Sequence, residues 1–158
     1  MRAGVVIKKF FFFAVFIFIS GVSIAYYYGV IPTSVGLHSK YYISSNIAME
    51  GYDLTIYHTQ KKANKGDVRF NYKYDDTNWF FTNTRNQKLF AARPQKYIPK
   101  FGGYCTLMIS KGYTYPPDMN VWHLDKRKNL YFFKDNESKR EALNDWDNVI
   151  KEANKHWK

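Results

Sequence analysis

The thiol of Cys105 is the side chain with the most distinctive chemistry, because it is the single cysteine among 158 residues. A thiolate is a soft ligand that suits Cu(I) or Zn(II). Three other side chains are candidate co-ligands, namely His58, Met108 and, as a weaker candidate, His123. Cu(I) accepts two or three soft ligands whereas structural zinc takes four, so copper is favoured over zinc. In the alternative interpretation, Cys105 fills a small space in the core, as buried cysteines often do.

Other catalytic and binding signatures do not occur in the sequence. One cysteine excludes an intrachain disulfide framework and a thiolate-rich zinc finger. The strings GxGxxG and HExxH, and a GxxxxGK string followed by Ser or Thr, are missing, which excludes the common nucleotide and zincin motifs. No oxyanion motif accompanies Cys105 and His58 as a nucleophilic pair. We therefore expect a binding protein and not an enzyme.

An apolar segment opens the chain. Arg2, Lys8 and Lys9 precede an uncharged run, Phe10–Ile31, which reaches about 33 Å as a helix and is long enough to cross a membrane. Residues 1–31 therefore predict an anchor whose basic end stays in the cytoplasm while the remainder lies outside, in the periplasm or cell envelope. Two alternatives remain open. Ser23-Ile24-Ala25 resembles a signal-peptide cleavage site, which would release a secreted domain, and the run also suits a buried core helix.

The residues after the anchor predict an α+β domain that begins near residue 47, preceded by a linker over residues 32–46. Alternating residues 69–74, a polar turn and the aromatic run 79–82 predict one antiparallel hairpin. A second hairpin is expected over 121–133, around a charged turn.

Helices are expected to pack on these hairpins. A short helix starts at Thr84 and ends before Pro94. From Ser138 to Trp157 apolar residues recur at helical spacing, which predicts one amphipathic helix at the C-terminus.

A set of motifs in one order resembles the single-domain YHS family over residues 47–158. The motif residues are Gly51-Tyr52-Asp53, Tyr57, the string Pro94-x-x-Tyr97-x-Pro99-x-Phe101-Gly102-Gly103-Tyr104-Cys105, Trp122, Leu130-Tyr131 and Asn154-x-x-Trp157. The family is similar to metal-binding modules attached to copper-transporting ATPases and monooxygenases. The resemblance implies a small exported or membrane-anchored domain that binds a metal, with copper the most plausible ion.

The charge favours a second class of function. The chain has 24 basic and 13 acidic residues, and only three basic residues lie within the N-terminal segment, so the remainder carries a net charge of +8. This charge attracts anionic headgroups or acidic polymers of the envelope, whereas an exported domain rarely meets nucleic acid. The alternative to a copper-binding domain is therefore a metal-free module, anchored at the membrane, that binds another envelope protein or an anionic surface.

Overall fold

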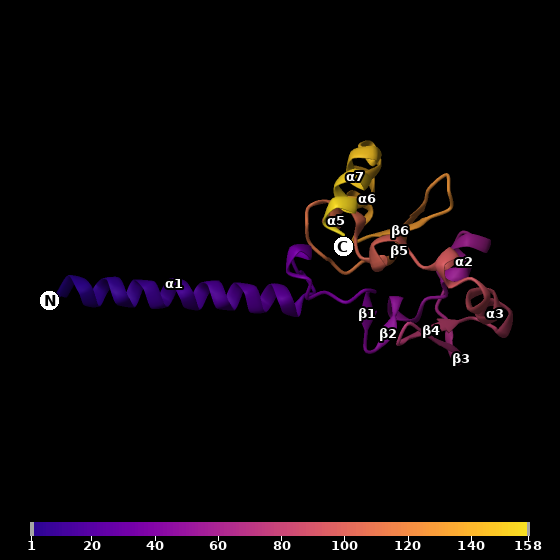
Figure 1. Cartoon of the computed structure of the whole chain (residues 1–158), viewed down its shortest axis with the longest axis horizontal. Helices are drawn as coiled ribbons and strands as arrows, with labels where there is room; N and C mark the ends of the chain where they lie inside the picture. The colour runs from indigo at the N-terminus through magenta and orange to yellow at the C-terminus, as the bar shows by residue number, and fades with distance from the viewer. Residues whose placement is uncertain (1, 158) are drawn as a thin grey trace.

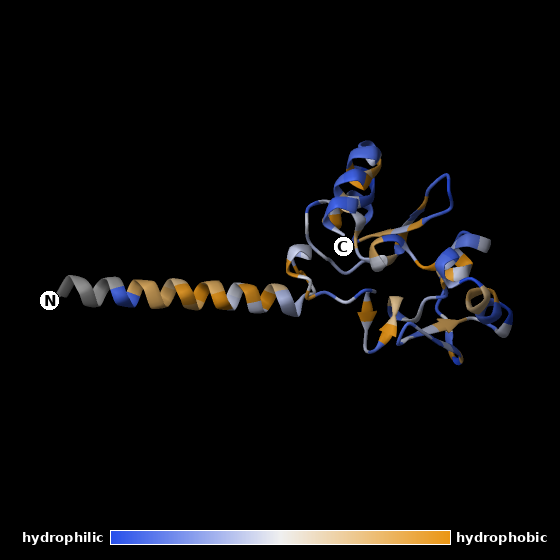
Figure 2. Cartoon of the chain, in the orientation of Figure 1, coloured by the Kyte–Doolittle hydropathy of each residue, from blue (hydrophilic) through white to orange (hydrophobic). Residues whose placement is uncertain are grey.

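The computed structural model describes residues 2–157, with side chains from residue 8 onward, so Met1, Lys158 and the side chain of Arg2 lie outside the described part. Figure 1 shows one long helix, α1 (Arg2–Tyr27), that projects from a domain formed by the rest of the chain. Apart from Lys8 and Lys9 at its start, the segment Lys8–Tyr27 is mainly apolar (Figure 2). Its most apolar stretch is not buried. The helix is therefore long and apolar enough to cross a membrane, as an anchor or a signal sequence, and it does not pack as a core helix.

The chain between α1 and the domain is fixed by hydrogen bonds. Thr114 donates its hydroxyl to the carbonyl of Gly29 at 2.9 Å and accepts the amide of Ile31 at 3.0 Å, while its own amide bonds to the Ile31 carbonyl. Pro32 pairs with Tyr113 in an isolated bridge, before the turn η1 (Thr33–Val35). Residues 32–46, expected as a linker, are thus held against the domain at this end.

One half of the domain is built on a mixed sheet. Within residues 2–157, four strands lie in the order β1 (Ile43–Ser44), β2 (Ile47–Ala48), β4 (Thr77–Phe81) and β3 (Asp67–Tyr74). The β3–β4 pair is antiparallel, whereas β2 runs parallel to β4. Around this sheet lie η2 (Met49–Gly51), α2 (Leu54–Thr59), α3 (Thr84–Ala92) and α4 (Pro94–Tyr97). Trp79, Phe81 and Phe90 form the centre of their shared core.

The other half pairs two strands with three helices. Strand β5 (Asp118–Leu124) runs antiparallel to β6 (Leu130–Phe133). The turn η3 (Lys100–Gly103) and helices α5 (Thr106–Ser110), α6 (Asn136–Asn144) and α7 (Trp146–His156) pack beside them.

Every side chain of β6 is buried, and the two faces of the strand enter different cores. Leu130 and Phe132 join the core of the first half, while Tyr131 and Phe133 join the core of the second. Because side chains alternate across a strand, this one strand ties the two halves of the domain together.

The predicted α+β class is confirmed, but the C-terminal helix differs from the prediction. The helix begins at Asn136, because the Asp135 carboxylate accepts the amide of Ser138 at 2.7 Å and caps it. Asp145 then leaves helical geometry, with φ −137° and ψ 52°, and divides the segment into α6 and α7. The single helix predicted from Ser138 to Trp157 was therefore wrong.

Candidate functional site

Cys105 lies at the start of α5 and is fully buried. Its amide donates to the carbonyl of Tyr115 at 3.0 Å, and its backbone pairs with Phe132 of β6. Burial raises the pKa of the thiol, which keeps it protonated near neutral pH. A protonated, enclosed thiol is a poor ligand and a slow nucleophile.

The predicted co-ligands lie in different surroundings. Met108 follows Cys105 by one turn of α5 and packs, half-buried, on the same core. His58 lies near the end of α2 against Tyr97, with ring centres 5.3 Å apart, and burial together with Lys61 and Lys96 lowers its pKa to about 4. His123 lies on β5 against Trp146.

The four predicted donors are not gathered into one group. Among the residues that the structure describes, no three side chains of His, Cys, Asp or Glu are grouped so that they could hold an ion. The one soft pair lies at an apolar core, where Cys105 is fully buried and Met108 is partly buried.

Asp53, one of the motif residues, instead forms a structural hub. It is fully buried and caps α2 by accepting the amide and hydroxyl of Thr55, at 3.0 and 2.7 Å. Its other oxygen accepts the amide and hydroxyl of Thr82, at 2.8 and 2.9 Å, and the amide side chain of Asn86 at 2.8 Å. One carboxylate thus joins α2, the end of β4 and α3.

The remaining motif residues also build the fold. Tyr57 is fully buried and donates its hydroxyl to the Met119 carbonyl at 2.8 Å. Gly102 and Gly103 both have positive φ, and a Cβ on Gly102 would lie 2.2 Å from the Lys40 carbonyl oxygen. The others line the cores or turns, namely Gly51, Tyr52, Pro94, Tyr97, Pro99, Tyr104 and Trp122.

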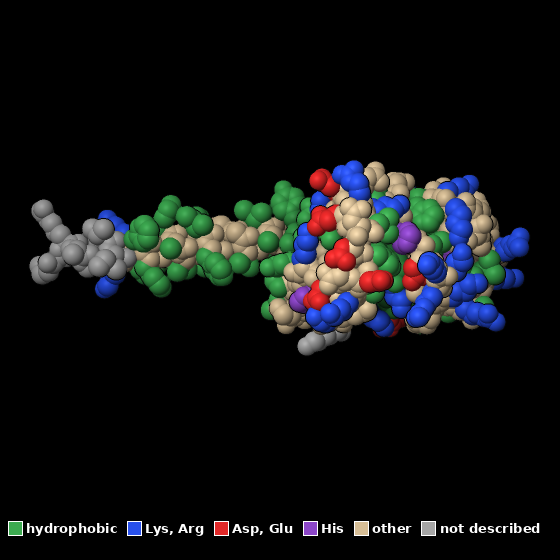
Figure 3. Space-filling model, turned by 90° about the horizontal axis from the view of Figure 1, so that it is seen from above, with side chains coloured by type: hydrophobic (Ala, Val, Ile, Leu, Met, Phe, Trp, Pro, Cys, Tyr) green, Lys and Arg blue, Asp and Glu red, His purple; other side chains and the backbone are tan. Residues whose placement is uncertain are grey.

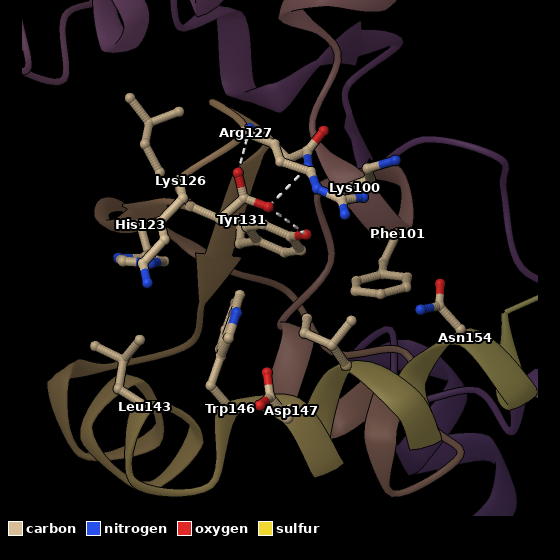
Figure 4. A pocket seen from close by; sticks show the side chains of 14 residues that line it. Lys100, Phe101, His123, Lys126, Arg127, Tyr131, Leu143, Trp146, Asp147 and Asn154 are labelled. Carbon is tan, nitrogen blue, oxygen red and sulfur yellow. Dashed lines mark hydrogen bonds between the residues drawn. The ribbon is translucent and has the colours of Figure 1, made fainter.

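A groove opens between the β5–β6 turn and α7, and it has a volume of about 760 Å³ (Figure 4). Phe101 and Tyr131 form a buried aromatic floor, and Trp146 rises from the start of α7 toward Tyr131 with ring centres 4.8 Å apart. Its polar and aliphatic walls are Lys100, His123, Leu124, Asp125, Lys126, Arg127, Asn129, Leu143, Asp147, Ile150 and Asn154. We call this the aromatic groove.

Three cations, two of them on the β5–β6 turn, border the aromatic groove. Lys100, Lys126 and Arg127 are exposed. Asp125 is engaged by its own turn, because it accepts the side chain of Asn129 at 2.7 Å and the hydroxyl of Tyr131 at 3.2 Å. The three cations are therefore available to a ligand. Of the two carboxylates in the groove, Asp125 is already hydrogen-bonded and Asp147 is the other.

Comparison with protein-family models, with curated proteins and with solved structures finds no match for this chain.

A second hollow adjoins the aromatic groove and extends its positive charge. The two share Lys100, Phe101, Asn129 and Asn154, and the second adds Lys96, which makes no ion pair within residues 8–157, and Lys40, which is paired with Asp75. Helices α2 and α3 lie at the end of the domain farthest from α1 (Figure 1), and exposed basic residues on or next to α2, α3 and α4 form what we call the basic end: Lys61, Lys62, Lys65, Arg85, Lys88, Arg93 and Lys96. Within residues 8–157 none of these seven makes an ion pair.

Figure 3 shows the resulting separation of charge on one face. Lys and Arg side chains crowd the end of the domain farthest from α1, while Asp and Glu lie mainly in the half nearer to it. The sequence already indicates this separation of charge. No acidic residue occurs from Thr77 to Pro117, whereas six basic ones do: Arg85, Lys88, Arg93, Lys96, Lys100 and Lys111. Sequence reasoning missed the groove, because Trp146 on a helical apolar face predicts a core residue.

Proposed function

We propose that this protein is a non-enzymatic, membrane-anchored domain that binds an anionic polymer of the cell envelope along the aromatic groove. The observation that carries the proposal is the combination, in one groove, of a half-buried Trp146 with the exposed cations Lys100, Lys126 and Arg127. Aromatic faces bind flat apolar surfaces such as sugar rings, while Arg and Lys bind carboxylates or phosphates.

The length of the positive surface supports a polymer over a small anion. The aromatic groove continues through the shared residue Lys100 into the second hollow, and Lys96 belongs both to that hollow and to the basic end. His123 contributes no charge near neutral pH, because burial lowers its pKa. The neutral ring and the amides of Asn129 and Asn154 are suited to hydrogen bonds with hydroxyl groups.

The test is a binding assay with the full chain in detergent micelles. Polygalacturonate supplies carboxylates, polyphosphate supplies phosphates, and neutral dextran is the control polymer. We expect one of the anionic polymers to bind, with an affinity that falls as salt is raised. Lys100→Gln with Arg127→Gln should weaken binding about tenfold, equivalent to about 1.4 kcal/mol, whereas the matched control Lys151→Gln on α7 should change it little. Equal binding of dextran, or equal loss in the control, would refute the proposal.

The proposal places the domain outside the cytoplasm, with α1 retained as the anchor. Lys8 and Lys9 of α1 precede its uncharged run, and positive flanks favour the cytoplasmic side. A C-terminal reporter should therefore be active outside the cytoplasm, and the mature protein should keep Phe10–Ile31. A mature N-terminus at Tyr26 or later would show that the segment is a cleaved signal.

Copper binding through Cys105 is the second candidate, and it agrees with the resemblance to YHS domains. The observation that favours it is the pair of sulfur side chains, Cys105 and Met108, on one turn of α5 in one core. Cu(I) titration of the full chain tests it, with Cys105→Ala and Met108→Leu as variants and His58→Gln as the third predicted ligand. Uptake by the native chain that Cys105→Ala abolishes supports this candidate, and its absence refutes it.

A further inference from the structure

Exposed apolar side chains gather where α1 meets the domain. Tyr26, Tyr27 and Tyr28 at the end of the helix are 63, 83 and 64% exposed. Val35 and Leu37, which follow in the chain, are 55 and 70% exposed, and Tyr113 is 44% exposed. We call these six residues the apolar collar.

Exposed hydrophobic side chains are concentrated in the collar and are rare on the rest of the domain surface. Between residues 28 and 157, four large hydrophobic side chains are more than half exposed, and three of them, Tyr28, Val35 and Leu37, belong to the collar. The fourth, Val68, stands alone on β3. In Figure 3 hydrophobic side chains continue from α1 onto the adjoining edge of the domain.

Hydrogen bonds fix the domain part of the collar to the end of the helix. Thr114 binds the carbonyl of Gly29 and the amide of Ile31, and Thr33 donates its amide to the Gly112 carbonyl at 2.9 Å. Tyr113 lies between these two attachment points and pairs with Pro32. These hydrogen bonds therefore hold the exposed side chains of the domain beside the end of α1.

The occupant of this surface follows from its continuity with the membrane span. Lys8–Tyr27 covers 20 residues, about 30 Å as a helix, which matches the hydrocarbon core of a bilayer. The tyrosines at its end then lie at the level of the lipid headgroups, where Tyr is enriched. Val35, Leu37 and Tyr113 adjoin that level, and apolar side chains are more stable in the interface than in water.

We propose that the apolar collar docks the domain onto the outer leaflet, with Val35, Leu37 and Tyr113 inserted into the lipid interface. The proposal rests on retention of α1 and is independent of what the aromatic groove binds. Docking holds the domain against the bilayer at the end that adjoins α1, so the basic end, which is the end farthest from the helix, faces away from the lipid.

Site-directed fluorescence on the full chain in phosphatidylcholine vesicles tests the proposal. Single variants Val35→Cys and Leu37→Cys are labelled with nitrobenzoxadiazole, and lipids with a nitroxide near the headgroup serve as quenchers. Phe16→Cys reports whether α1 spans the bilayer, and Val68→Cys is the matched control because Val68 is 67% exposed on the domain. The unmodified chain reports any labelling of the buried Cys105.

We expect the label at positions 35 and 37 to shift to shorter wavelength and to be quenched strongly, while the label at position 68 stays unquenched. Equal quenching at positions 37 and 68, with position 16 inside the bilayer, overturns docking and leaves the anchor and the binding proposal intact. A label at position 16 that remains in water overturns the anchor and the docking together. Polymer binding is measured separately, so its failure is distinguished from either result.

Discussion

Replacement of Asp53 tests whether the motif residues of this chain act through the fold. The Asp53 carboxylate is fully buried and accepts five hydrogen bonds, two from Thr55, two from Thr82 and one from Asn86. Within residues 8–157 it forms no ion pair, so these donors alone compensate its burial. Asp53→Ala removes every acceptor at once and leaves the amides of Thr55 and Thr82 without their partner.

The magnitude follows from the number of orphaned donors. A buried donor without a partner costs about 1–3 kcal/mol, and a hydrogen bond to a charged group contributes about 1.5–3 kcal/mol. The hydroxyls of Thr55 and Thr82 can rotate to other acceptors, so two backbone amides and one side-chain amide carry most of the cost. We expect Asp53→Ala to lower the free energy of unfolding by about 3–5 kcal/mol, a large share of the about 5–15 kcal/mol of a typical domain.

Urea unfolding of the full chain in detergent micelles, followed by tryptophan fluorescence, measures this loss. Asp53→Asn keeps one acceptor oxygen and should lose about 1–3 kcal/mol, because its amide group faces at least one donor. Asp76→Asn is the matched control, since that side chain is 98% exposed, and it should stay within about 0.5 kcal/mol of the native chain. If Asp53→Ala loses no more than Asp76→Asn, the hub does not hold the three segments together and the reasoning is wrong.

Four further predictions follow from the site and its surroundings. The thiol of Cys105 should resist iodoacetamide in the native chain and react on unfolding, and a native rate close to the unfolded rate would contradict its burial. Because burial lowers the pKa of His58 to about 4 from 6.5, the unfolded chain binds more protons between these values. Stability should therefore fall as pH is lowered from about 6.5 to about 4, by about 1–2 kcal/mol after allowance for partial exposure, and His58→Leu should remove that slope in urea titrations. Trp146→Ala should cost about 2 kcal/mol, less than a fully buried tryptophan, yet abolish polymer binding; unchanged binding would exclude stacking in the groove. Gly103→Ala should cost more than about 2 kcal/mol, because its Cβ would lie 2.3 Å from Cε of Met49 at positive φ, and Met49→Ala should restore part of the loss in thermal melts.

Much of the fold could be predicted from local pattern. Residues 69–74 alternate and lie within β3, and the short helix predicted to end before Pro94 ends at Ala92. Two features could not be predicted this way. The parallel contact of β2 with β4 joins segments about thirty residues apart, where one register pair, Ile47 with Asn78, leaves no periodic signal. The break at Asp145 leaves no trace in the hydrophobic pattern, because the apolar spacing continues across it.

The candidate site was less predictable than the fold. A lone thiol beside a double glycine suggests chemistry, yet Cys105 is buried, because its backbone pairs with Phe132 of β6 and that strand contributes apolar side chains to both cores. The aromatic groove depends on the exposure of Trp146, which the helical period assigns to a buried face. Whether one residue on the apolar face of a helix is exposed depends on which segment of the chain packs against that face. The local sequence pattern does not contain that information.

If α1 is retained as the proposed anchor, the hydrogen bonds of Thr114 to Gly29 and Ile31 also set the distance from the membrane at which the domain meets a ligand. A domain on a flexible tether samples a volume that grows with the tether length, and its effective concentration at any one point is diluted accordingly. In the proposed anchored state the groove would have a fixed height above the lipid. A ligand in a thin layer at that height would meet it at a high local concentration, and a ligand outside the layer would not meet it. Insertion of a few Gly-Ser residues after Tyr28 would enlarge the volume that the domain samples and lower its effective concentration at any one height. The contacts within the groove would not change.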